Sequence, residues 1–155
     1  MKKLLDNPIL FRLYLLTKLP SALFAGLKIT HFTPDAAAVT VPYKWFTRNP
    51  FKSTYFACLA MAAEMSTGLL AMSNIYKRTP PVSMLVTHLE ANYHKKATGR
   101  TTFTCTDGPL IKAAIETAIA TNEPQTLRAR SAGANPSGDL IAEFYITWSF
   151  KVKSK

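Results

Sequence analysis

The chain of 155 residues is organised around one segment, which reads Asn49-Pro-Phe-Lys-Ser-Thr-Tyr-Phe-Ala-Cys-Leu-Ala-Met-Ala-Ala-Glu64. Residues 53–72 are mostly small and apolar, and Glu64 is the only charge among them. The run is long enough to cross a bilayer, but its central carboxylate and its Ser and Thr residues make insertion costly. We therefore predict a buried core helix over residues 53–72, with Ser53 or Thr54 as its N-cap.

On the N-terminal side, the sequence predicts a helix and then a β-hairpin. Residues 4–17 have apolar side chains at helical spacing, which indicates an amphipathic helix that ends near Leu19-Pro20. Its apolar face is expected to comprise Leu5, Ile9, Leu13 and Leu16. Residues 26–43 alternate with a period of two around a turn at residues 33–35, which is typical of a hairpin.

The C-terminal half is predicted to be mostly strand. The expected strands cover residues 82–91, 100–106, 126–130 and 140–152, and a short helix is expected over residues 109–121. The sequence contains neither an internal repeat nor a linker. These patterns predict a single α+β domain over residues 1–155, in which an antiparallel sheet wraps around the central helix.

The composition limits the partners. Nineteen Lys and Arg against nine Asp and Glu give a net charge of +10, which favours a polyanionic partner such as nucleic acid, an anionic membrane or a phosphate-bearing small molecule. Nucleic acid is disfavoured because the basic residues are dispersed and no aromatic-interleaved motif accompanies them. Two cysteines without a CxxC motif disfavour a disulfide framework or a zinc site and fit a reducing cytoplasm.

The lone acid of the central helix is the strongest candidate for chemistry. A buried carboxylate without a partner costs several kcal/mol, so Glu64 must be neutralised by a raised pKa, hydrogen-bonded, or facing a cavity. Such an acid is typical of a catalytic group. It is equally typical of a carboxylate at a helix kink or a dimer seam that a backbone amide satisfies.

The layout resembles that of the hotdog-fold thioesterases: a hairpin, a loop with an Asn, a small-residue helix with one central acid, and then antiparallel strands. In the phenylacetate-type branch, a loop Asn precedes a His-Gly-Gly helix start and a mid-helix acid. Asn49 matches the Asn, Tyr55 the His, Phe56 the first Gly and Glu64 the acid. Because other residues replace His-Gly-Gly here, the chain is more similar to a poorly characterised branch of the hotdog-fold proteins. The resemblance covers residues 24–152 and leaves residues 1–20 as an N-terminal helical extension.

The resemblance implies a homodimer, possible pairing of dimers into a tetramer, and an acyl-CoA or acyl-carrier thioester as substrate. Ser53 and Glu64 lie eleven positions apart, roughly 16 Å along one helix. In the hotdog-fold thioesterases, each active site therefore combines the helix start of one chain with the acid of the other chain. No cofactor or metal is expected, since coenzyme A arrives as part of the substrate.

The resemblance also assigns roles. The backbone N–H groups of Tyr55 and Phe56 would stabilise an oxyanion. Glu64 of the partner chain would activate water or attack directly. Asn49 would position the water or brace the loop, and Ser83 would hold the water. The candidates for the coenzyme A phosphates are Lys95, Lys96 and Arg100, with Lys77 and Arg78 as further candidates.

Each assignment has a simpler structural alternative. Asn49 can shape a turn before Pro50, Tyr55 can pack on the sheet, and basic turns are usually solvated. Cys58 is predicted to pack as a small apolar residue. The three histidines, His31, His88 and His94, share no metal-ligand spacing. The loss of His-Gly-Gly favours a second function, a non-catalytic protein that binds acyl thioesters or lipids, and the basic N-terminal helix allows peripheral membrane contact.

Overall fold

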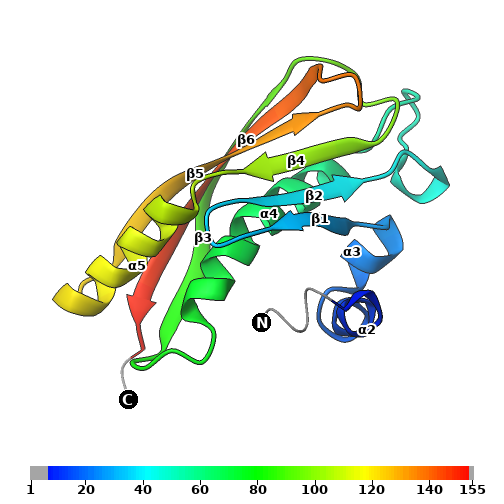
Figure 1. Cartoon of the computed structure of the whole chain (residues 1–155). Helices are drawn as coiled ribbons and strands as arrows, with labels where there is room; N and C mark the ends of the chain where they lie inside the picture. The colour runs from blue at the N-terminus through cyan, green and yellow to red at the C-terminus, as the bar shows by residue number, and fades with distance from the viewer. Residues whose placement is uncertain (1–6, 154–155) are drawn as a thin grey trace.

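The computed structural model describes residues 7–153, and it has the predicted α+β architecture (Figure 1). Leu5, predicted for the apolar face of the N-terminal helix, and the basic residues Lys2 and Lys3 at the start of the chain lie outside this range. The elements in chain order are α2 (Pro8–Lys18), α3 (Pro20–Ala25), β1 (Lys28–Phe32), β2 (Ala37–Val41), the 3-10 turn η1 (Trp45–Thr47), α4 (Phe56–Ile75), β3 (Val82–Tyr93), β4 (Thr101–Cys105), α5 (Gly108–Thr121), β5 (Gln125–Ala134) and β6 (Leu140–Val152).

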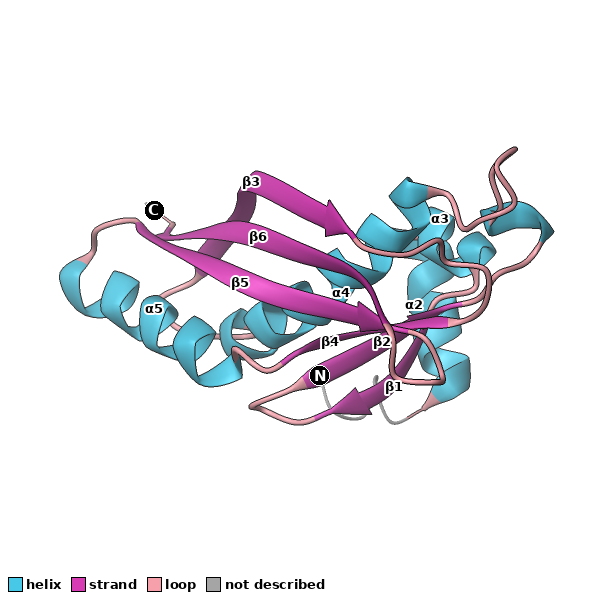
Figure 2. Cartoon of the chain, turned by 90° about the horizontal axis from the view of Figure 1, so that it is seen from above, coloured by secondary structure: helices cyan, strands magenta, loops and turns pink. Residues whose placement is uncertain are grey.

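The six strands form one sheet in the order β1-β2-β4-β5-β6-β3, with every neighbouring pair antiparallel. The twisted sheet covers α4 on one face (Figures 1 and 2). The C-terminal helix α5 packs beside α4 and against β5 and β6. This sheet wrapped around a long helix is the hotdog fold, and β3 is one of its two open edges.

The central helix fits under the sheet because its buried positions are small. Ala62, Ala63 and Ala71 are fully buried, and α4 packs against β2, β4 and β5. At Gly68 an added Cβ would lie 3.1 Å from Glu64 Oε1 and in ordinary contact with the Trp148 ring at 3.4 Å, so the helix, the carboxyl and the indole of β6 pack closely here. Length and composition would let α4 span a membrane, yet most of it is buried within the fold. The prediction of a core helix is confirmed.

Two polar contacts fix the rotation of α4 under the sheet. The Trp148 Nε1–H donates to Thr67 Oγ1 at 2.9 Å, and the hydroxyls of Ser66 and Ser131 lie 2.8 Å apart. All four side chains are buried. Because a buried polar group without a partner is costly, these pairs favour this rotation of the helix over others.

The sheet core is tightly packed where β4 meets β5, and this leads to a prediction for Gly133. Phe103 is fully buried opposite Gly133, and a Cβ at Gly133 would lie 2.4 Å from its ring. We expect Gly133→Ala to lower the free energy of unfolding by roughly 1–3 kcal/mol through overpacking. Urea denaturation measures this. Gly99→Ala is the control because nothing lies within 4 Å of its Cβ, and equal stability of both variants would contradict the packing described.

The N-terminal helix ends where the sequence predicts, because α2 stops at Lys18 and Leu19 leaves the helical conformation. The short helix α3, which starts at Pro20, was not predicted. The buried face of α2 carries Phe11 and Leu15. The predicted apolar side is not the buried one, since its described members Ile9, Leu13 and Leu16 are exposed.

The start of the central helix also differs from the prediction. The helix begins at Phe56, and its N-cap is Tyr55, which makes no side-chain capping bond. Ser53 and Thr54 belong to the preceding loop, where the Thr54 hydroxyl donates to the Ala97 carbonyl at 3.1 Å. That contact ties the helix entry to the segment after β3. The strand β5 is also longer than predicted, since it continues to Ala134 through the small residues 131–134.

Candidate active site

A groove of about 590 Å³ lies at the start of α4 and is called the helix-start groove below. Its lining comes from residues 49–51 and 53–56, from Leu59 on α4, and from residues 93–97 after β3. The structure thus brings together five residues that the sequence proposed for one site. They are Asn49, Tyr55, Phe56, Lys95 and Lys96.

Asn49 shapes the loop that leads into α4. Its Oδ1 accepts hydrogen bonds from the Phe51 N–H at 3.0 Å and from both the N–H and the hydroxyl of Ser53 at 3.2 Å. These contacts close an Asx turn, in which the side chain replaces a backbone acceptor. The loop-bracing interpretation of Asn49 therefore describes its contacts, and its amide group still borders the groove.

The helix start presents two unpaired backbone donors. The Cys58 and Leu59 N–H groups donate to the Tyr55 carbonyl. Within residues 7–153, no acceptor is bonded to the N–H groups of Phe56 and Ala57. These two donors and the helix dipole favour a negative charge at this point.

The prediction that the Tyr55 N–H is free is wrong. It donates to the Thr47 carbonyl at 2.6 Å, because η1 folds back against the loop. Ala57 takes its place beside Phe56 as the second donor. The Tyr55 side chain stays exposed, with its ring edge against Phe56 at 4.9 Å between centroids.

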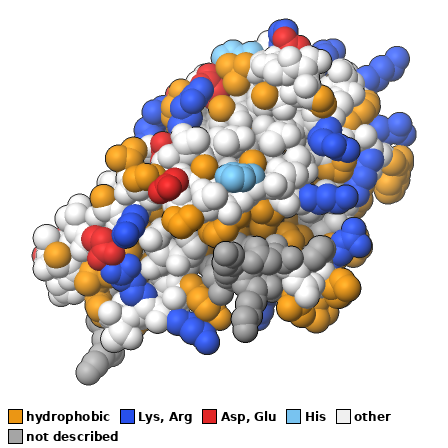
Figure 3. Space-filling view, in the orientation of Figure 1, with side chains coloured by type: hydrophobic (Ala, Val, Ile, Leu, Met, Phe, Trp, Pro, Cys, Tyr) orange, Lys and Arg blue, Asp and Glu red, His pale blue; other side chains and the backbone are white. Residues whose placement is uncertain are grey.

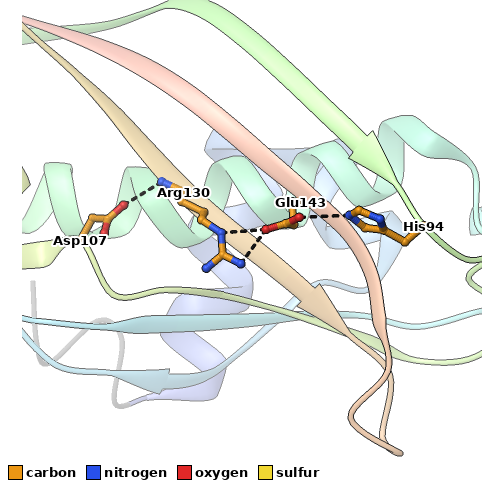
Figure 4. Close-up of polar contacts among 4 residues, drawn as sticks. All are labelled: His94, Asp107, Arg130 and Glu143. Atoms are coloured by element: carbon orange, nitrogen blue, oxygen red, sulfur yellow. Dashed lines mark hydrogen bonds and ion pairs between the residues drawn. The ribbon is translucent and has the colours of Figure 1, made fainter.

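The basic turn after β3 is held by acids on the β5–β6 hairpin. Lys95 Nζ pairs with Asp139 at 2.8 Å, and His94 Nε2 lies 3.0 Å from Glu143. Glu143 also accepts two hydrogen bonds from Arg130, whose backbone N–H donates to Asp107 (Figure 4). Hydrogen bonds from Arg130 and His94 hold the pKa of Glu143 below its ordinary value. The network fixes the position of the turn beside the groove.

The remaining basic candidates divide into those at the groove and those away from it. Lys96 lines the groove and makes no ion pair with any acid of residues 7–153, so its ammonium group is available to a ligand. Arg100 is exposed on the same turn but is not part of the lining. Lys77 and Arg78 lie at the opposite end of α4, where Arg78 pairs with Glu116.

Glu64 lines a second, smaller groove of about 160 Å³, called the Glu64 groove below. Its other walls are apolar and come from α2, α4 and the Met84 side chain of β3. Burial raises the pKa of the Glu64 carboxyl. No described side chain or backbone donor is hydrogen-bonded to that carboxyl. The sequence left three possibilities for Glu64: a raised pKa, a hydrogen bond or a cavity. The structure agrees with the raised pKa and the cavity.

Nothing in the sequence pattern indicates that α2 forms a wall of this groove. Phe11, Tyr14 and Leu15 line it, and the Tyr14 hydroxyl lies 3.8 Å from the Met72 sulfur. A helical pattern predicts an apolar face but does not predict which element that face will cover. Glu64 itself was found because it is the only charge in the core helix.

The two grooves are separate within one chain. None of the described lining residues is common to both. Phe56 and Glu64 are eight residues apart on α4, roughly 12 Å along its axis. A thioester carbonyl at the helix start of one chain is therefore out of reach of Glu64 in that same chain.

Other predicted residues have ordinary structural roles. The Ser83 hydroxyl donates to the Lys151 carbonyl at 3.0 Å, and Ser83 lines neither groove. Burial raises the pKa of the Cys58 thiol, although Lys44 opposes the shift, which agrees with its packing as a small apolar residue. Among residues 7–153, no three His, Cys, Asp or Glu side chains are placed to share a metal ion.

Comparison with known proteins places the chain in a family. Residues 9–149 match the model of a family described as a domain of unknown function, DUF4442. The chain belongs to this family. The match begins inside α2, so most of the N-terminal helix is part of the family's domain. No curated protein matches the chain.

Several solved structures share the fold. One is PA5026 from Pseudomonas aeruginosa, a protein of unknown function described as a probable thioesterase, with 16% identity, a TM-score of 0.78, and 95% of this chain and 97% of that chain covered. Another is thioesterase HI1161 from Haemophilus influenzae, with 15% identity, a TM-score of 0.65, and coverages of 92% and 90%. A mutant of thioesterase PA1618 from Pseudomonas aeruginosa has 13% identity, a TM-score of 0.67, and coverage of 91% of both chains. At these identities the similarity establishes the hotdog fold.

The raised pKa of Glu64 makes stability depend on pH. As pH rises past the ordinary carboxyl range, the unfolded state loses this proton before the folded state does. The folded protein therefore loses stability until pH passes the raised pKa. We expect Glu64→Gln to stabilise the protein relative to wild type more at pH 8 than at pH 4.

Urea denaturation at pH 4 and pH 8 measures this difference. Glu123→Gln, at an exposed glutamate after α5, is the matched control and should show no such gain. A Glu64→Gln variant that is less stable than wild type at pH 8 would show that the carboxylate has a stabilising partner.

Proposed function

We propose that this protein hydrolyses acyl thioesters at a site shared between two copies of the chain. The observation that carries the proposal is the position of Glu64, a carboxyl with a raised pKa in an apolar groove on the core helix. A general base is most effective when its pKa is near the working pH. The hotdog fold, shared with proteins described as thioesterases, supports the same chemistry.

The proposed reaction divides the work between two chains. The thioester carbonyl oxygen lies against the Phe56 and Ala57 N–H groups of one chain. Glu64 of the partner chain takes a proton from water, and the oxygen of that water attacks the carbonyl carbon. The helix-start donors stabilise the resulting oxyanion. The carbon–sulfur bond then breaks, and the proton passes from Glu64 to the leaving sulfur.

The edge of the sheet supports a two-fold dimer. β3 is twelve residues long, has β6 on one side only, and exposes Leu85, Leu89 and Tyr93. A long edge strand with apolar side chains is a ready site for pairing with another strand. A two-fold axis perpendicular to two paired β3 edges reverses directions perpendicular to itself, so the two α4 helices, which lie along the sheet (Figure 1), would run antiparallel. That arrangement brings Glu64 of each chain toward the helix start of the other.

The direct test is the release of free thiol from a panel of acyl-CoA esters, from short to long and aromatic. Turnover of at least one ester by the wild type supports the proposal. Saturable binding of an ester without turnover would instead support the second function, a non-catalytic protein that binds acyl thioesters. Tyr55 favours that alternative. It stands at the His position of the phenylacetate-type hotdog thioesterases, and its N–H is already bonded to the Thr47 carbonyl.

The coenzyme A phosphates are proposed to contact the basic turn, and this gives a prediction for Lys96. Because its ammonium group has no acidic partner among the described residues, we expect Lys96→Ala to raise KM for an acyl-CoA roughly two- to fivefold. The kcat should be unchanged. The matched variant Lys95→Ala should have a smaller effect, because Lys95 is already paired with Asp139. The same KM increase with an acyl-N-acetylcysteamine, which lacks phosphate, would argue against this contact.

A further inference from the structure

Three exposed aromatic side chains form a cluster at one end of the molecule, called the aromatic end below. Phe24 of α3 and Phe46 of η1 have ring centroids 6.3 Å apart, and Trp45 lies 6.5 Å from Phe46. Their exposed fractions are 57% for Phe24, 51% for Phe46 and 78% for Trp45. Large aromatic rings are usually covered, and a contiguous exposed group of them marks an interaction site.

Basic residues flank the aromatic end in the sequence. Residues 36–63 contain Lys44, Arg48 and Lys52 and no acid. The Lys44 side chain lies against the C-terminal end of α3, since a Cβ at Gly26 would lie 2.7 Å from its Nζ. None of these three cations makes an ion pair with an acid of residues 7–153.

The acidic side chains lie away from the aromatic end. Asp35 is the only acid in residues 7–63, and its carbonyl accepts the Gly108 N–H at the start of α5, at the other end of the β1–β2 hairpin. In Figure 3, Lys and Arg gather with hydrophobic side chains along the right-hand side of the molecule, where α3 and η1 lie in Figure 1. The acids visible in this view lie toward the left and the top. The charge of the chain is therefore asymmetric.

We propose that the aromatic end binds the surface of an anionic lipid bilayer. Tryptophan and other aromatic rings prefer the headgroup level of a membrane, and nearby Lys and Arg add attraction to anionic lipids. A second copy of the chain fits this surface poorly. A two-fold contact would set each cationic surface against its own image, with no described acid to offset the repulsion. This inference does not depend on the proposed hydrolysis, since neither groove nor Glu64 takes part in it.

The two tryptophans make the binding directly measurable. Trp45 is 78% exposed, whereas Trp148 is 3% exposed and bonded to Thr67. We expect vesicles of phosphatidylcholine with phosphatidylserine to shift the tryptophan emission of the full chain to shorter wavelength. Phosphatidylcholine vesicles alone should give a much smaller shift. The Trp45→Phe variant should co-sediment with anionic vesicles as wild type does but lose the emission shift.

Substitutions locate the surface. Trp45→Ser combined with Phe46→Ser is expected to weaken co-sedimentation with anionic vesicles at least roughly tenfold. Arg48→Glu should weaken it as well, and added salt should weaken binding of the wild type. The apolar control is Leu110→Ser on α5, where the side chain is 56% exposed. The charge control is Lys153→Glu, and both controls should bind as wild type does.

Three results would overturn the proposal. The first is equal binding of the wild type to neutral and anionic vesicles, or no binding to either. The second is unchanged binding by the double serine variant. The third is a double serine variant that changes the oligomeric state of the protein in analytical ultracentrifugation, since the aromatic end would then be an interface between copies of this chain.

Discussion

Glu64→Gln is expected to lower kcat for acyl-thioester hydrolysis by roughly 10²–10⁴-fold, the usual contribution of general base catalysis. Glutamine keeps the size of the side chain but cannot take the proton from water. Glu64 is the only carboxyl among the described lining residues of the two grooves, and His94, which lines the helix-start groove, is hydrogen-bonded to Glu143. The same variant is expected to remain folded, because removal of a half-buried charge relieves a desolvation cost.

Thiol release under saturating ester measures the effect, with Glu123→Gln as a control that should keep wild-type turnover. The pH profile of the wild type gives a second readout. Because burial raises the pKa of Glu64, kcat should rise with pH through a value above the ordinary carboxyl range. A Glu64→Gln enzyme with full activity would show that water is activated by another group.

Phe56→Pro is the second substitution with a large expected effect, because it deletes a single N–H group from the helix start. Removal of one oxyanion donor typically costs about 10²–10³ in kcat. The position suits proline. Phe56 is the first residue of α4, where its N–H has no partner in the helix. Tyr55 before it has φ −61° and ψ 133°, a conformation that proline allows in its preceding residue.

The matched control is Phe56→Ala, which removes the exposed ring but keeps the N–H. We expect Phe56→Ala to retain turnover within roughly tenfold of wild type, since only ground-state contacts are lost. Circular dichroism and urea denaturation check that both variants fold. If Phe56→Pro and Phe56→Ala reduced kcat equally, the ring rather than the N–H would be the functional group, and the oxyanion assignment would be contradicted.

Most of the fold could be predicted from the sequence because its signals are local. The period-two patterns in residues 26–43 and 140–152 and the long apolar run with Glu64 are each visible within one segment. The start of α4 could not be located in this way. Ser53 and Thr54 are good N-cap residues, but a local hydrogen bond from Ser53 to Asn49 and a tertiary one from Thr54 to Ala97 hold them in the loop.

The candidate site was predicted in part, for a similar reason. Glu64 was identified by being the only charge in an apolar helix, and Asn49 by its place before that helix. The pairing of Lys95 with Asp139, the bonded N–H of Tyr55 and the contribution of Phe11 to the Glu64 groove depend on segments far apart in the chain. No periodicity in one segment reports such contacts.

A complementation assay tests the central claim, a thioesterase site shared by two chains, most directly. Glu64→Gln and Phe56→Pro proteins are denatured, mixed in equal amounts and refolded together, and thiol release is measured. Each mixed dimer then has one site with an intact Glu64 and an intact helix start, so about a quarter of wild-type activity should return. Each variant refolded alone should stay inactive. No recovery in the mixture, from proteins shown to form mixed dimers, would contradict a site shared across the dimer.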